Sequence, residues 1–357
     1  MNSSKENFNK PRILIIGSGI IGKFNAIELS NTGFEVTITD PNEINNGSNS
    51  ALGILMGKIY HKRGGRSWEL RKESMKLWPE WIRILKRFDQ NIRIEKPLIQ
   101  LTSSEKKFEK MKKFVIKNTE DKLDIIYNNS KLLNNILNHF IGAEYKGMIS
   151  YEDGRVDPRI LLKTLNELIK EKKIKTIKEK IIKIKKINNQ WISTSSTGEE
   201  IKSEIIIICN SLNALELINK ESFQLEPVVG QAIEFKYENK DVNFLSLPKH
   251  FSIDGINFIP ISKTRITIGS TDEYNLKPKK EFVDELITNI KHKPLWLKEE
   301  NICKKWYGIR SKPIGEISPV MRSIENRLIL CSGFYKNGIL LAPACAKWVK
   351  NEIKKHL

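Results

Sequence analysis

The segment that most restricts the fold is a glycine-rich turn that follows a short aliphatic run near the N-terminus. Residues 12–40 read RILIIGSGIIGKFNAIELSNTGFEVTITD, so the GxGxxG turn comes directly after four consecutive aliphatic residues. The run predicts a buried parallel strand, the residues after the turn predict a helix, and residues 34–39 predict a second strand, which Asp40 closes. Strand, glycine turn, helix, strand and terminal acid together predict a dinucleotide-binding α/β domain.

The spacing of this turn assigns a role to each glycine and to the acid. Gly17 makes the tight turn, Gly19 lets the backbone approach a pyrophosphate, and Gly22 lets the helix pack closely on the strand. Asp40, 18 residues after Gly22, can accept a hydrogen bond from a ribose 2′-hydroxyl and would repel the 2′-phosphate of NADP. NAD and FAD both remain compatible with it. The cofactor contacts predicted here are Gly17, Ser18, Gly19, Ile20, Ile21, Gly22 and Asp40.

A segment of small and polar residues follows, where a plain NAD domain would begin another strand–helix unit. Residues 45–57 read NNGSNSALGILMG, without helical or strand periodicity. We expect the hydroxyls of Ser48 and Ser50, together with Gly53, to lie against the cofactor. An ordinary surface loop is the alternative, but the aliphatic residues embedded in the segment fit a fully solvated loop poorly.

Three later segments predict regular elements around this unit. Residues 68–85 have the periodicity of an amphipathic helix, which Pro79 is expected to end or kink. In residues 154–169, Asp157 and Pro158 predict a turn and the start of a helix, with the proline near its first position. Residues 176–214 predict a three-stranded meander and then a buried strand that leads to Asn210. Because asparagine tolerates a left-handed backbone, Asn210 is a candidate for a tight turn beside the cofactor.

The chain carries a formal net charge of +19, which admits two explanations. A nucleic-acid or anionic-membrane partner is one, and a general bias toward lysine, isoleucine and asparagine is the other. The densest run, residues 170–186, alternates isoleucine with lysine near its end, as a strand with one solvated face does. No aromatic residues are interleaved there to stack on bases. We therefore do not expect a nucleic-acid partner.

Targeting and metal signals are weak. Residues 1–10 are polar and predict a flexible N-terminus without a signal peptide. The apolar runs fall far short of the roughly 20 residues that span a bilayer, so we expect a cytoplasmic protein. The cysteines form no CxxC pair and the histidines show no ligand spacing, so we expect no metal site.

The C-terminal part contains a second glycine-rich turn. Residues 331–344 read CSGFYKNGILLAPA, in which polar and aromatic residues precede an apolar helical run. A turn that opens a helix presents free backbone N–H groups at the positive end of the helix dipole. An electron-rich group is therefore expected to lie there.

The order of these segments resembles the D-amino-acid oxidase family of FAD-dependent oxidoreductases, most closely its glycine oxidase branch of the thiamine-biosynthesis type. The motifs that carry the resemblance are GSGIIG with Asp40, the small-residue loop at 48–53, GRVDPRILLKTL from residue 154, PVVGQ at 227–231, IPISKTRITIGSTDE at 259–273, YGIR at 307–310 and GFYKNGILLAP at 333–343. The resemblance implies an α/β fold, with a Rossmann-like FAD-binding domain on a parallel sheet. It also implies an inserted α+β substrate domain built on an antiparallel sheet.

The implied division is discontinuous. The FAD-binding domain would comprise residues 11–88, 145–222 and 308–357. The substrate domain would comprise residues 89–144, which have a loose, polar, helical character, and residues 223–307, which alternate like antiparallel strands.

The resemblance implies a non-covalent FAD and further contacts to it. Backbone N–H groups near residues 337–339 would face the pyrimidine edge of the flavin, where reduction leaves negative charge. The additional cofactor-binding residues implied are Ile181, Asn210, Gly333, Asn337, Gly338 and Ile339.

On the substrate side the resemblance implies that Arg310 binds the carboxylate of an amino acid. A guanidinium suits this role because it forms a bidentate clamp of fixed orientation. A structural ion pair is the alternative. The chain departs from the branch at Asn257, which replaces a tyrosine, and at Lys336, which replaces an arginine. We expect Asn257, Tyr335 and Lys336 to set the choice of substrate.

The implied activity is oxidation of a small amine or amino acid, glycine-like or a D-amino acid, by hydride transfer to flavin N5. The products would be an imine and, with O2 as acceptor, H2O2, and the imine would feed thiamine thiazole synthesis. The alternatives are a D-amino-acid dehydrogenase with a quinone acceptor, a tRNA wobble-uridine modification oxidase, and a flavoprotein retained for binding a partner. A homo-oligomer is compatible with all of them.

Overall fold

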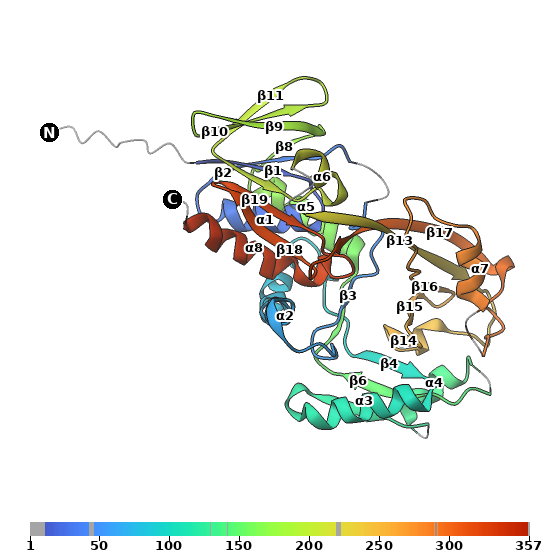
Figure 1. The fold of residues 1–357 in the computed structure, drawn as a ribbon. Coiled ribbons are helices and arrows are strands. Elements are labelled where there is room, and N and C mark those ends of the chain that lie inside the picture. The colour runs from blue at the N-terminus through green and yellow to red at the C-terminus, as the bar shows by residue number, and fades with distance from the viewer. Residues whose placement is uncertain are drawn as a thin grey trace.

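The computed structural model describes residues 11–42, 46–128, 130–140, 142–218, 223–288, 290 and 292–355. The flexible N-terminus expected over residues 1–10 lies outside them, as does Asn45 of the small-residue loop. The chain forms two parts, each built on a large sheet (Figure 1). Within the described residues, no helix is both long enough and apolar enough to cross a bilayer.

The first part is built on a six-stranded sheet that is parallel except for one edge strand. In spatial order its strands are β18 (Val320–Glu325), β19 (Leu328–Ser332), β12 (Ile205–Ile208), β1 (Arg12–Ile16), β2 (Glu35–Thr39) and β8 (Lys175–Ile177). Only β18 runs antiparallel to its neighbour. The predicted unit is present, because β1 and β2 pair in parallel and α1 (Ile20–Ser30) connects them.

Both faces of this sheet are covered, which explains why its central strands are aliphatic throughout. One face packs against α1, α2 (Gly65–Leu85), α5 (Pro158–Glu171) and α8 (Gly338–Lys354). The other packs against α6 (Ala214–Leu217) and the predicted meander of β9 (Ile181–Ile187), β10 (Gln190–Ser195) and β11 (Glu200–Ser203). Alternate residues of β1 and β12 therefore enter two different cores.

Helix α2 runs through Pro79, so of the two effects expected of this proline, it does not end the helix. Trp78 is fully buried and Trp81 nearly so, and Phe24 of α1 contacts both rings. An interior proline costs about 3 kcal/mol. Burial of the apolar stripe on both sides of Pro79 outweighs that cost.

The second part is built on an eight-stranded sheet. In spatial order its strands are β17 (Ile302–Ile314), β13 (Gln224–Lys236), β16 (Arg265–Gly269), β15 (Ile256–Ser262), β14 (Phe251–Ile253), β4 (Leu98–Thr102), β6 (Lys146–Ser150) and β5 (Leu123–Ile126). All neighbours are antiparallel except β14 and β4, which pair in parallel. Aromatic residues from several elements form its core, among them Phe140, Phe235, Phe244, Phe258 and Trp296.

The remaining elements of the second part are short. They are α3 (Glu105–Lys117), α4 (Lys131–Leu137), α7 (Glu281–Thr288), and the 3-10 turns η1 (Thr119–Asp121), η3 (Phe244–Ser246) and η4 (Glu299–Asn301). Residues 89–144 thus supply strands β4 and β5 as well as the expected helices. Strand β6 also belongs to this sheet. The expected boundary at residue 145 therefore does not coincide with the boundary between the sheets.

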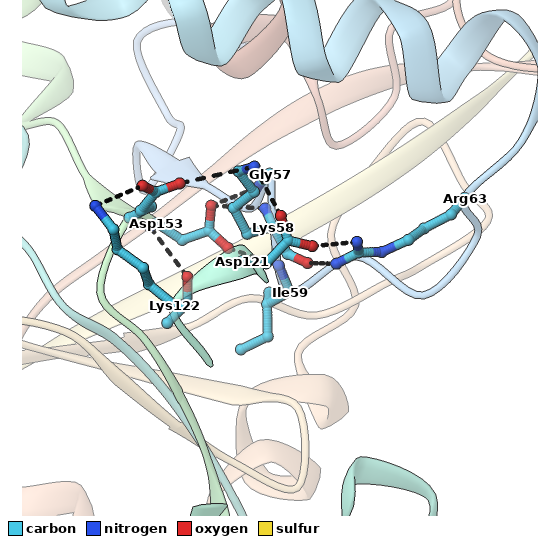
Figure 2. A network of polar contacts seen from close by, with 9 residues as sticks. Gly57, Lys58, Ile59, Arg63, Asp121, Lys122 and Asp153 are labelled. Atoms are coloured by element: carbon cyan, nitrogen blue, oxygen red, sulfur yellow. Dashed lines mark hydrogen bonds and ion pairs between the residues drawn. The ribbon is translucent and has the colours of Figure 1, made fainter. Parts of the chain in front are cut away.

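A polar network joins the turn after β3 (Ile54–Leu55) to the second part (Figure 2). The carboxylate of Asp153 is fully buried and accepts hydrogen bonds from the three backbone N–H groups of residues 57–59, at 2.7–2.9 Å. Burial raises the pKa of Asp153, and these three bonds oppose that effect. Asp121 accepts from the side chains of Lys58, at 2.8 Å, and Arg63. The network fixes the turn, and β3 itself pairs with β7 (Gly154–Arg155).

Candidate active site

A cavity of about 780 Å³ lies where the two parts meet. Residues of the glycine turn, the small-residue loop, β17, β19 and the start of α8 line it. Of the residues predicted for the site, Ser18, Gly22 and Gly333 do not line the cavity, and all the others do. Among the described residues, no three histidine, cysteine or acidic side chains come together as metal ligands do.

The glycine turn is close-packed in the way the spacing predicts. Gly17 has φ of +104°, and a Cβ there would lie 2.7 Å from the backbone of Cys209. A Cβ on Gly22 would lie 1.9 Å from the carbonyl oxygen of Gly17. The N-terminus of α1 therefore opens onto the cavity, where the backbone N–H of Ile20 donates to Ser48 Oγ at 2.9 Å. An oxygen thus already occupies the helix N-terminus, the position that suits a phosphate.

Asp40 lies at the end of β2 and lines the cavity, as predicted. Its carboxylate accepts hydrogen bonds from the backbone N–H groups of Ser18, at 2.5 Å, and Asn42, at 2.7 Å. Lys23 donates to Ser18 Oγ at 2.8 Å, and burial lowers the pKa of Lys23. The acid therefore has a fixed orientation before any ribose binds.

The turn after β12 differs from the expectation in one residue. Asn210 has φ of −91°, outside the left-handed region, whereas Ser211 has φ of +58°. The hydrogen-bonded turn begins at Asn210, whose carbonyl accepts from the backbone N–H of Asn213 at 3.2 Å, but the left-handed residue is Ser211, the first residue of the 3-10 turn η2 (Ser211–Asn213). The Oδ1 atom of Asn210 is buried without a partner among the described residues, and Asn210 lines the cavity. A buried acceptor of this kind requires a donor from a ligand or water.

Ser50 has a role that the sequence did not indicate. Its hydroxyl donates to the backbone carbonyl of Tyr307 at 2.6 Å, and its own carbonyl accepts from Trp306 Nε1 at 3.3 Å. A Cβ on Gly308 would lie 2.5 Å from Ser50 Cβ. Ser50 therefore holds the small-residue loop against β17.

The start of α8 lies beside the start of α1. A Cβ on Gly338 would lie 3.7 Å from the Ile20 side chain. Asn337 occupies the N-cap position of α8, but its side chain makes no capping hydrogen bond. Tyr335, in the preceding turn, has φ of +51°, a backbone conformation that costs about 1–2 kcal/mol for a non-glycine residue. Two positive helix ends therefore face one cavity.

Arg71 was not predicted as a site residue. It is 4% exposed, lines the cavity and donates to the Met56 carbonyl at 2.6 Å and to Asn337 Oδ1 at 2.8 Å. Its guanidinium lies 3.6 Å from the centroid of the Tyr60 ring. Burial lowers the pKa of Arg71. One sequence signal for a buried Arg71 was available. Arg71 lies three residues before Ser74 on α2, so both side chains lie on the same side of the helix.

Arg310 lies on β17, is partly buried with 16% of its side chain exposed, and lines the cavity. Its Nη1 atom donates to the Thr271 carbonyl at 3.0 Å and to Asp272 Oδ1 at 2.8 Å, and its Nη2 atom donates to Ser270 Oγ at 2.6 Å. The guanidinium lies over Gly230, where a Cβ would approach Nη2 to 2.0 Å. Burial lowers the pKa of Arg310, and the nearby Asp272 opposes this.

Asn257 connects the cavity to a buried histidine. Its Nδ2 atom donates to the Gly269 carbonyl at 2.9 Å, so its Oδ1 atom faces His250 Nε2 at 3.0 Å. His250 is 1% exposed, and burial lowers its pKa to about 4. The imidazole is therefore neutral at pH 7 and donates from Nε2.

This histidine predicts a pH dependence of stability. The unfolded chain has a histidine pKa of about 6.5 and the folded protein one of about 4, so between these values the unfolded state binds more protons. The free energy of unfolding should therefore fall as the pH drops, by ~2 kcal/mol between pH 7 and pH 5 from this group. Urea unfolding followed by tryptophan fluorescence should show a flatter pH dependence for His250→Gln. Partial burial and Arg63 also lower the pKa of His61, but this residue is exposed, so His61→Gln should flatten the dependence less than His250→Gln; an equal flattening would contradict the prediction.

A glycine turn, an acid after the second strand and a partly buried arginine line one cavity, which is the arrangement expected of a dinucleotide-dependent oxidoreductase. The family model for FAD dependent oxidoreductases matches residues 12–351, and the chain belongs to this family. Its cofactor is accordingly FAD. The close-packed glycine turn, the oxygen at the start of α1 and the orphaned amide oxygen of Asn210 fit such a dinucleotide.

Solved structures with the same fold cover nearly the whole chain. Glycine oxidase from Geobacillus kaustophilus aligns with a TM-score of 0.82 at 20% identity, over 98% of this chain and 96% of that one. Iminodiacetate oxidase from Chelativorans sp. BNC1 aligns with a TM-score of 0.82 at 14% identity, over 97% and 96%. FAD-bound L-alpha-glycerophosphate oxidase from Mycoplasma pneumoniae reaches 0.81 at 15% identity, over 97% and 95%. No curated protein matches the sequence.

Proposed function

We propose that this protein oxidises a small amine or amino acid that carries a carboxylate. The observation that carries the proposal is the partly buried Arg310, which lines the same cavity as the glycine turn and the start of α8. Similar structures named glycine oxidase and iminodiacetate oxidase support this substrate class. In the proposed arrangement the part built on the six-stranded sheet binds FAD, and the part built on the eight-stranded sheet binds the substrate.

The residues of the chain contribute mainly by orientation and charge. FAD, when bound, accepts a hydride from the carbon next to the substrate nitrogen. Arg310 binds the substrate carboxylate and thereby sets the direction of that C–H bond. Tyr335, Lys336 and Asn257 shape the space around the substrate. The positive end of α8, near residues 337–339, stabilises negative charge on the cofactor side.

The rest of the proposed reaction needs no side-chain base. The amine binds neutral, loses a hydride and a proton, and leaves as an imine that water hydrolyses. O2 is the proposed electron acceptor, which gives H2O2, and the proposed location is the cytoplasm. Supply of the imine to thiamine thiazole synthesis is the proposed use of the product.

An anaerobic visible spectrum of the purified protein tests this function. Glycine, sarcosine, iminodiacetate and a set of D-amino acids would be added in turn to the yellow holoprotein. Bleaching by one of them is expected, and admission of air should restore the colour with one H2O2 per turnover. A yellow protein that none of these compounds bleaches would overturn the proposed substrate class. Recovery of the colour only with a quinone would replace O2 as acceptor.

A further inference from the structure

Asp272 lies in the cavity between two cationic side chains that come from other elements. Its Oδ1 atom lies 2.8 Å from Arg310 Nη1, and its Oδ2 atom accepts from Lys336 Nζ. The Tyr335 hydroxyl lies 3.5 Å from the same Oδ1. Asp272 follows β16, Arg310 lies on β17 and Lys336 precedes α8. The three side chains are brought together only by the fold.

This triad of Asp272, Arg310 and Lys336 has a net charge of +1 when all three groups are ionised. One added carboxylate makes the set neutral, and two added carboxylates make it negative. Excess charge of one sign in a partly buried site is unfavourable, because solvent screens it less than at the surface. Arg71, which Met56 and Asn337 hold, is not in contact with the triad in any described hydrogen bond. The triad therefore matches a monocarboxylate better than a dicarboxylate.

We propose that Asp272 determines substrate specificity by limiting the site to substrates with a single carboxylate. Asp272 pairs with both cations and offsets one unit of their charge, so that one net positive charge remains to balance the substrate. Without Asp272 the two cations would balance two carboxylates. The proposal rests on the proposed function, because it names which member of that substrate class the site takes.

Two other roles for Asp272 lead to different results. If Asp272 only held Arg310 in place, its removal would weaken the binding of all carboxylates by a similar factor. If Asp272 bound the substrate's amino group, its removal would weaken the binding of glycine but leave the binding of acetate unchanged. The ratio of the affinities for a monocarboxylate and a dicarboxylate therefore distinguishes the proposed role from these two.

The experiment is isothermal titration calorimetry of the FAD-loaded protein with acetate and with malonate, neither of which carries an amine to oxidise. A positive charge gained by the site stabilises a dianion about twice as much as a monoanion. For Asp272→Asn we therefore expect the ratio of the acetate Kd to the malonate Kd to rise about tenfold over that of the wild type. The double variant Asp272→Asn/Lys336→Met should lose this rise.

The control is Glu226→Gln, which removes a carboxylate that pairs with Lys312 on β17 at 2.6 Å and does not line the cavity. It should leave the ratio at the wild-type value. An unchanged ratio in Asp272→Asn, a rise that survives in the double variant, or binding of neither acid to either protein would overturn the proposal. A thermal unfolding curve and the FAD absorbance confirm that each variant is folded. If no amine bleaches the flavin but Asp272→Asn still raises the ratio of the acetate Kd to the malonate Kd, the proposed function is wrong and the proposed limit on substrate charge is supported.

Discussion

Replacing Arg310 by methionine is expected to weaken the binding of carboxylate-bearing substrates by ~2–5 kcal/mol. The partly buried guanidinium lies directly over Gly230, and its Nη1 and Nη2 atoms are held by Ser270, Thr271 and Asp272. Arg310→Lys should recover little, because an ammonium cannot hold Ser270, Thr271 and Asp272 and still present a planar fork. The measurement is the substrate concentration that gives half the maximal rate of anaerobic flavin bleaching.

Lys312→Met is the matched control for this prediction. Lys312 lies two residues along the same strand, pairs with Glu226 and does not line the cavity. It should change the half-saturating concentration less than about twofold, which is the range of an exposed ion pair. An amine without a carboxylate should respond weakly to Arg310→Met. Equal losses for amines with and without a carboxylate would show that Arg310 has a structural role alone.

Gly22→Ala is expected to lower the free energy of unfolding and to weaken the binding of FAD. Its new methyl group would lie 1.9 Å from the carbonyl oxygen of Gly17, a backbone atom of a close-packed turn that cannot rotate away as a side chain could. Relief requires α1 to move away from β1, which we expect to cost ~3 kcal/mol, at the upper end for overpacking. The same movement would withdraw the N-terminus of α1 from the cavity. Urea unfolding and the ratio of flavin to protein absorbance measure the two effects.

Gly64→Ala is the control, because a Cβ there meets no atom within 4 Å. Gly64 is the N-cap of α2 and has an extended backbone with φ of −166°. We expect the free energy of unfolding to fall by no more than about 1 kcal/mol, because glycine at this N-cap provides no side-chain capping bond that alanine would remove. The content of FAD should be unchanged. If the two alanine variants unfold alike and both keep FAD, the close packing at Gly22 is not what holds the cofactor turn.

The N-terminal unit could be predicted almost residue by residue, because its determinants are local. The aliphatic run, the glycine spacing and Asp40 lie within 29 consecutive residues, and each acts on its near neighbours. The same holds for α5, which begins at Pro158 with Asp157 as the N-cap, its side chain accepting from the backbone of Arg159. Capping and turn chemistry require only a few adjacent residues. The structure places these elements where the sequence predicts them.

Asp272 shows what the sequence could not reveal. It stands inside the motif GSTDE, yet its partners are 38 and 64 residues away, on β17 and in the turn before α8. Strands β4, β5 and β6 could not be predicted from the sequence for a related reason. Each is only four or five residues long, and β4 is completed by a parallel partner, β14, that comes about 150 residues later. Short strands depend on tertiary pairing more than on their own composition.

The pairing of β13 with β17 determines how a substrate can reach the cavity. These two long strands run from the six-stranded part into the eight-stranded part and pair along their whole length, from Gln224 with Ile314 to Phe235 with Ile302 (Figure 1). Two strands paired along their length can bend together, but their hydrogen bonds restrict the dihedral angles of each residue. A hinge needs a few residues that are free to change those angles. We therefore expect the two parts not to open about a hinge between them. Substrate entry is then expected to depend on the loops that line the cavity, among them residues 46–53, and the rate of turnover would depend on how quickly those loops move.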